Sequence, residues 1–130
     1  MTVGLLYNKN KKESVHYVKL LTEAIVEISR RESAGREIWN VIDSADYRQD
    51  SAAASADLLI SIGGDGTFLK TAAIAILREL PVLGFHLGTL GLLTEFEKND
   101  LEKTVLRLVK GEYVIEERMT LRITVDDGEK

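Results

Sequence analysis

The stretch Ile60-Ser61-Ile62-Gly63-Gly64-Asp65-Gly66-Thr67-Phe68-Leu69 decides the fold, because it joins two apolar segments through three glycines and one acid. The run Leu58–Ile62 reads as a strand and Phe68–Leu80 as a helix, so a tight turn is predicted between them. Glycines in such a turn permit positive φ and let a ligand approach backbone N–H groups. The start of the helix adds unpaired N–H groups and partial positive charge, which favour phosphate. The acid at the tip, Asp65, predicts proton transfer or metal handling in addition to phosphate binding.

Strand and helix patterns alternate along the rest of the chain. We expect strands at Thr2–Tyr7, Glu37–Ile42 and Val82–Phe85, helices at Glu13–Glu32 and Leu101–Lys110, an alanine-rich linking region at Asp43–Ala56, a glycine-rich loop at His86–Leu93 and a strand pattern at Tyr113–Val125. This alternation predicts an α/β fold in three layers, a mostly parallel sheet with helices on both faces. Ligands of such sheets bind beyond the carboxyl ends of the strands, so the turn and the glycine-rich loop are expected at that edge. They lie side by side if their strands are neighbours.

Composition excludes several classes of protein. The length of 130 residues fits one domain, and the net charge of −4 without a basic stripe argues against a nucleic-acid partner. No apolar stretch reaches the length of a membrane span, so no membrane partner is expected. The N-terminus lacks the basic region and cleavage site of a signal peptide, which makes the cytoplasm the expected location. There is no cysteine, and no His, Asp and Glu set has metal-site spacing, so no protein metal site is predicted.

The glycine turn is neither a P-loop, since no Gly-Lys-Ser/Thr follows it, nor the dinucleotide fingerprint, whose glycine spacing differs. We expect the Asp65 carboxylate to accept a proton from a substrate hydroxyl while the amides of Gly64–Thr67 bind nearby oxygens. The alternative is a tight connection in which Asp65 only caps the helix. Lys70, one turn into the helix, is either a phosphate contact or a solvated lysine. In the second loop His86 is the only histidine near this edge, and from the residues alone a structural role is favoured over catalysis.

Three segments carry recognisable motifs. They are Gly63-Gly64-Asp65-Gly66-Thr67-Phe68-Leu69, then Pro81-Val82-Leu83-Gly84-Phe85-His86-Leu87-Gly88-Thr89-Leu90-Gly91-Leu92-Leu93-Thr94, and Glu117-Arg118-Met119-Thr120-Leu121. Together these segments resemble the bacterial NAD kinases. The first segment is shared with diacylglycerol and sphingosine kinases and, more loosely, with phosphofructokinases. The second distinguishes them, because such lipid kinases usually continue toward a Gly-Thr-Gly-Asn loop that is not present here.

The resemblance implies a Rossmann-like domain that transfers a phosphoryl group from ATP, or polyphosphate, to the 2′-hydroxyl of the adenosine ribose of NAD, giving NADP. Magnesium, or another divalent cation, would accompany ATP. Asp65 would be the general base. The residues implied in NAD binding are Asp65, Gly66, Lys70, Gly64, Thr67, Leu69, His86 and Leu92. His86 stands where many members have Asn, and Leu92 where many have Phe.

The resemblance also implies a second domain, a β-sandwich with an Asn-Glu pair and a Gly/Ser/Thr-rich loop, neither of which occurs in this chain. Residues 1–112 are therefore expected to form the α/β N-terminal domain and residues 113–130 the start of the β-rich domain. The chain alone is expected to be inactive or nearly so, and the full-length protein to be a homo-oligomer, a dimer or tetramer. Two alternatives stay open: a lipid kinase catalytic domain and a non-catalytic nucleotide-binding module.

Overall fold

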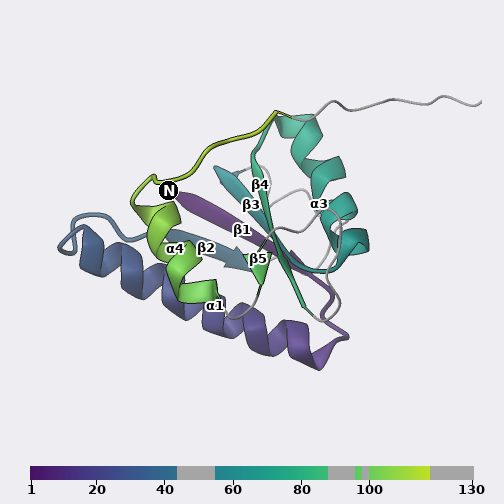
Figure 1. The fold of residues 1–130 in the computed structure, drawn as a ribbon, viewed down its shortest axis with the longest axis horizontal. Helices are drawn as coiled ribbons and strands as arrows, with labels where there is room; N and C mark the ends of the chain where they lie inside the picture. The colour runs from purple at the N-terminus through teal and green to yellow at the C-terminus, as the bar shows by residue number, and fades with distance from the viewer. Residues whose placement is uncertain (44–54, 88–95, 98–99, 118–130) are drawn as a thin grey trace, which may run out of the picture.

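The computed structural model describes residues 1–43, 55–87, 96–97 and 100–117, which form an α/β domain around one sheet (Figure 1). The strands lie in the order β2-β1-β3-β4-β5, and every pairing between them is parallel. Their bounds are β1 Thr2–Tyr7, β2 Asn40–Asp43, β3 Leu58–Gly63, β4 Val82–His86 and β5 Phe96–Glu97. The predicted α/β fold with a mostly parallel sheet is confirmed.

Helices cover both faces of the sheet, as the alternation predicts. Helices α1 (Lys12–Glu32) and α4 (Leu101–Val109) pack together on one face, and α3 (Asp65–Arg78) lies on the other (Figure 1). The strands β1 and β3 are buried along almost their whole length, as strands covered on two faces must be. Among the described residues, no helix is both long enough and apolar enough to cross a membrane.

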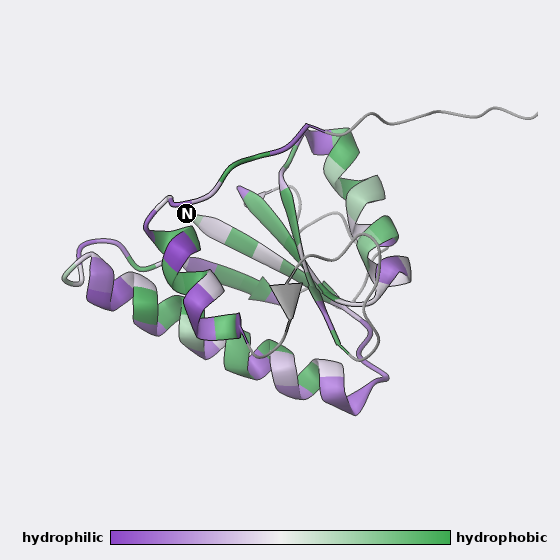
Figure 2. Cartoon of the chain, viewed as in Figure 1, coloured by the Kyte–Doolittle hydropathy of each residue, from purple (hydrophilic) through white to green (hydrophobic). Residues whose placement is uncertain are grey.

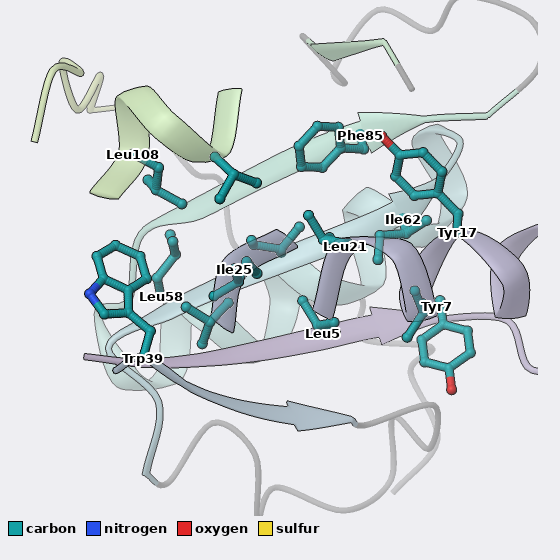
Figure 3. Packing of buried hydrophobic residues seen from close by; sticks show 14 of the residues in the cluster. Leu5, Tyr7, Tyr17, Leu21, Ile25, Trp39, Leu58, Ile62, Phe85 and Leu108 are labelled. Atoms are coloured by element: carbon teal, nitrogen blue, oxygen red, sulfur yellow. The ribbon is translucent and has the colours of Figure 1, made fainter. Parts of the chain in front are cut away.

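The larger core lies beneath α1 and α4. Apolar side chains of α1 meet alternate residues of β1, β3 and β4. In Figure 2 hydrophobic and hydrophilic bands alternate along the α1 ribbon, as expected of a helix with one apolar face. Figure 3 shows this packing, with Leu5, Leu21, Ile25, Leu58, Ile62 and Phe85 all at most 6% exposed. The smaller core lies beneath α3 and consists of Leu6, Ala56, Leu59 and Ala75. Period-two alternation in the strands therefore assigns each side chain to one helical layer or the other.

The second predicted strand is shorter than expected. It begins at Asn40 instead of Glu37, because hydrogen bonds to α1 hold the preceding residues out of the sheet. The Trp39 N–H donates to Ser29 Oγ at 3.0 Å, and the Glu37 N–H donates to Ser33 Oγ at 2.9 Å.

Helix α3 begins earlier than expected, at Asp65 instead of Phe68. The Phe68 N–H donates to the Gly64 carbonyl at 3.0 Å, which closes a helical turn directly after the glycine pair. The helix ends at Arg78 because Glu79 takes a left-handed conformation, with φ of 54°.

The strand pattern predicted at Tyr113–Val125 is wrong for its first part. Residues 113–117 are irregular and exposed, with Val114 88% exposed, and they pair with no described strand. The rest of that segment, the centre of the Asp43–Ala56 linking region and most of the second loop lie outside the described residues. The short strand β5 was not predicted, because two residues are too few for a periodic signal.

Candidate functional site

The carboxyl ends of β3 and β4 bring the two glycine-rich segments together. These strands are neighbours, and Gly63, the last residue of β3, is paired in register with His86, the last residue of β4. The Leu87 N–H donates to the Gly63 carbonyl at 2.9 Å, so the second segment leaves the sheet beside the first. The expectation that the turn and the second loop begin side by side is confirmed.

The turn itself depends on one glycine with positive φ. Gly63 has a φ of +152°, and a Cβ placed on it would lie 2.7 Å from Thr67 Oγ1. Gly64 and Gly66 do not have positive φ, contrary to the simplest expectation for such a turn, and a Cβ on either would meet nothing within 4 Å. Gly63 is therefore required for packing inside the domain, whereas the other two leave open space beside the backbone.

Asp65 is the first residue of α3, and Gly64 is its N-cap. Asp65 therefore occupies the first helical position, one residue after the N-cap. Its side chain is half-buried, at the end of the helix that carries partial positive charge. A carboxylate in this place can receive a proton, while the amides of the first turn face the same edge of the sheet.

The first six residues of α3 contain most of the predicted binding residues. Gly66 and Lys70 are exposed, and Leu69 is 58% exposed, so this part of α3 faces outward. Thr67 is half-buried and lies over Gly63, and its carbonyl accepts a 2.8 Å hydrogen bond from Thr71 Oγ1. The structure thus gathers these residues around the turn.

Two of the predicted NAD-binding residues, Leu92 and His86, do not belong to this group around the turn. Leu92 lies outside the described residues. His86 is described, but it is only 5% exposed at the end of β4. Neither of its ring nitrogens has a hydrogen-bond partner among the described residues, and the same holds for the hydroxyl of Ser61 in β3. A buried polar group without a partner costs about 1–3 kcal/mol, so this pair is a conspicuous feature of the α3 face.

A second polar pair at the carboxyl edge was missed by sequence reasoning. The Tyr7 hydroxyl, at the end of β1, donates a 2.7 Å hydrogen bond to Asp43 Oδ1 at the end of β2. Burial raises the pKa of Tyr7 to about 12, and the bond to Asp43 and its negative charge act in the same direction. The available signal in the sequence was a tyrosine at the end of one strand and an aspartate at the end of the next.

Within the described ranges, no three His, Cys, Asp or Glu side chains converge as metal ligands would. A hollow of about 450 Å³ lies between α4, Leu83 of β4 and the segment from Glu112 to Val114. Leu83 packs with the core beneath α1 and α4, so this hollow is on the opposite face from α3. It does not belong to the Asp65 turn.

Comparison with known proteins agrees with the motifs. The model of the ATP-NAD kinase N-terminal domain matches residues 8–113. An NAD kinase from Acetivibrio thermocellus is 32% identical over 131 residues, which cover 98% of this chain and 45% of the relative. An NAD kinase from Corynebacterium diphtheriae is 51% identical over 77 residues, which cover 59% of this chain and 24% of the relative.

The fold agrees as well. A crystal structure of an NAD kinase from Archaeoglobus fulgidus in complex with ATP matches with a TM-score of 0.55 and 25% identity, over 86% of this chain and 38% of that one. The chain thus spans less than half the length of these relatives. Since the domain model covers most of the chain, from the first loop to the end of α4, the chain belongs to the NAD kinase family, whose N-terminal domain it matches.

Proposed function

We propose that the Asp65 turn transfers a phosphoryl group from ATP, or polyphosphate, to the 2′-hydroxyl of the adenosine ribose of NAD, giving NADP. One observation carries the proposal: a carboxylate is the first residue of α3, at the carboxyl edge of a parallel sheet, between two glycines with open space beside them. Family membership supplies the reaction class.

In the proposed reaction Asp65 accepts the proton of the 2′-hydroxyl as the ribose oxygen attacks the γ-phosphorus. The new oxygen–phosphorus bond forms as the bond to the leaving ADP breaks, and ADP takes the electron pair. The first amides of α3 stabilise anionic oxygens nearby, because their N–H groups lack intrahelical acceptors. Magnesium would accompany ATP as part of the MgATP substrate and neutralise the nucleotide phosphates.

The neighbours of Asp65 are proposed to hold NAD. Gly64 and Gly66 let the dinucleotide approach the backbone, because neither position carries a side chain. Leu69 offers an exposed apolar side chain to a flat ring, and Lys70 an exposed ammonium group to phosphate. Thr67 fixes the start of α3 against Gly63, and contacts of His86 and Leu92 with NAD stay predictions.

Asp65→Asn tests the proposal, because it removes the base and preserves the shape of the side chain. We suggest a chimaera in which this chain replaces the aligned 45% of the Acetivibrio thermocellus NAD kinase. The chimaera should form NADP from NAD and MgATP, and Asp65→Asn should lower kcat by about 10²–10⁴-fold with circular dichroism unchanged. Glu102→Gln is the matched control, since Glu102 is an exposed acid in the first turn of α4.

An Asp65→Asn chimaera within threefold of the parent would overturn the role of Asp65. Diacylglycerol and sphingosine are offered as acceptors in the same assay, and phosphorylation of either in preference to NAD would favour a lipid kinase. The 130-residue chain is assayed beside the chimaera. We propose that it is inactive or nearly so, and NADP formation at the rate of the full-length relative would refute this.

A further inference from the structure

Two buried polar side chains, Ser61 and His86, have no role in the proton and phosphoryl transfer steps, although His86 is also a predicted NAD contact. Ser61 is 0% exposed and His86 is 5% exposed. Within the part of the chain that the structure describes, Ser61 Oγ and both ring nitrogens of His86 have no hydrogen-bond partner. Such groups are nearly always paired in folded proteins, with protein or with internal water, so the pair points to a bound water.

The strand register places the two side chains on one face of the sheet. Ser61 pairs with Gly84, and Gly63 pairs with His86, so Ser61 and His86 are diagonal neighbours across β3 and β4. Leu59 and Val82, which precede them at two- and four-residue steps, belong to the core beneath α3. By alternation Ser61 and His86 also face α3. Gly84, which pairs with Ser61 and precedes His86 by two residues, contributes no side chain to this face.

The first half of α3 covers this place with threonines. Thr67 Oγ1 lies over Gly63, at 2.7 Å from the position that a Cβ would occupy there. Thr71 is 0% exposed, and its hydroxyl donates to the Thr67 carbonyl at 2.8 Å, which leaves its lone pairs available as acceptors. Further along the helix the cover becomes apolar at Ala75. The polar part of the interface between α3 and the sheet is thus confined to the half of α3 that begins at Asp65.

We propose that Ser61 and His86 bind an internal water molecule that joins β3 and β4 to α3 beneath the Asp65 turn. A neutral imidazole carries its donor and its acceptor on separate nitrogens that point in different directions, so one water can pair with the Ser61 hydroxyl and with one ring nitrogen of His86. The two remaining hydrogen bonds of that water are then available to α3. Because His86 is paired with Gly63 and the next residue bonds the Gly63 carbonyl, this water fixes the backbone on which Asp65 is held. Ser61 and His86 are then positioning residues.

The inference rests on the proposed function only in the importance that it gives to Asp65, and it is tested without measuring catalysis. Water–protein NMR cross-peaks in the purified protein should join a long-lived water to the side chains of Ser61 and His86. The amides of Phe68 and Leu87 donate to the carbonyls of Gly64 and Gly63, so their hydrogen exchange reports opening of the turn. Their exchange should be about tenfold faster in His86→Leu, the loss of one net hydrogen bond, and close to wild type in His86→Asn, which restores a donor and an acceptor. His16→Asn is the control, because His16 is exposed on α1.

Ser61→Ala provides a second variant, a small truncation that preserves the fold if His86→Leu does not. It should accelerate hydrogen exchange of the same amides. Exchange in the double variant should be no faster than in either single variant, because each single variant already loses the one shared water. Absence of the water cross-peaks, or multiplying effects in the double variant, would overturn the water site. Acceleration spread evenly over the domain, or no recovery in His86→Asn, would overturn the positioning role. None of these results depends on whether Asp65→Asn abolishes NADP formation, so the two proposals fail separately.

Discussion

Gly63→Ala should destabilise the domain by about 2–6 kcal/mol, because two independent costs meet at this residue. The new Cβ would lie 2.7 Å from Thr67 Oγ1 and 3.1 Å from Thr67 Cβ. Rotation of the threonine relieves the first contact but not the second, since Cβ moves only with the backbone, so the start of α3 must shift. Overpacking of this kind costs about 1–3 kcal/mol. The φ of +152° adds about 1–3 kcal/mol of backbone strain for a residue with a side chain.

Urea unfolding measures this cost. Trp39 is the only tryptophan in the chain and is 7% exposed, so its fluorescence reports unfolding of the core. Gly64→Ala is the matched control, because its Cβ would meet nothing within 4 Å and its φ is −116°. Only the loss of glycine at the N-cap distinguishes it from wild type, so its free energy of unfolding should fall by no more than about 1 kcal/mol. In a Thr67→Ala background the cost of Gly63→Ala should fall, because one of the two close contacts is gone. A Gly63→Ala protein as stable as Gly64→Ala would refute the close packing of α3 on this glycine.

Three further predictions concern other parts of the domain. Gly66→Ala should raise the free energy of unfolding in urea by up to about 1 kcal/mol, because Gly66 is exposed within α3 and alanine favours a helix more than glycine does. In the chimaera the same substitution should raise KM for NAD if the dinucleotide lies against this backbone. Tyr7→Phe should remove an alkaline loss of stability, because the pKa of Tyr7 rises from 10.0 to about 12 on folding. The contribution of this shift, about 3 kcal/mol, is complete below pH 10 and lost between pH 10 and 12, as urea titrations at several pH values would show. Ser29→Ala should cost about 1–3 kcal/mol in thermal or urea unfolding, because it leaves the buried N–H of Trp39 without its acceptor at 3.0 Å; an unchanged midpoint would contradict this.

The parts of the fold that sequence reasoning predicted well are those with a repeating pattern. The apolar run of β3 and the three- and four-residue periodicity of α1 each point to one kind of element, and the structure places both as expected. Boundaries were less accurate where hydrogen bonds between distant segments decide them. The irregular residues before β2 bond to Ser29 and Ser33 near the end of α1, and no local pattern signals such bonds.

Sequence reasoning predicts the chemistry of the candidate site, but it does not predict how the side chains of the site pack. Asp65 and its glycines are recognisable as a strand–turn–helix with an acid. The different roles of the three glycines are not recognisable from the sequence. Gly63 is required because it packs against Thr67, four residues later, whereas Gly64 and Gly66 leave open space. His86 was expected among the NAD contacts, and the structure places it beneath α3, diagonal to Ser61.

The sequence by itself determined that this protein is an α/β domain of NAD kinase type with one carboxylate in a glycine turn. The α/β fold follows from local periodicity, the turn from residues adjacent in the chain, and the family from the resemblance of its motifs. Only the tertiary structure decided which side chains share the space around Asp65. Ser61 and His86 are 25 positions apart in the printed sequence, and they become neighbours because β3 and β4 pair in parallel with a fixed register. Their burial, and the lack of hydrogen-bond partners for their polar atoms among the described residues, arise from that pairing and from the cover of α3, which no single segment specifies.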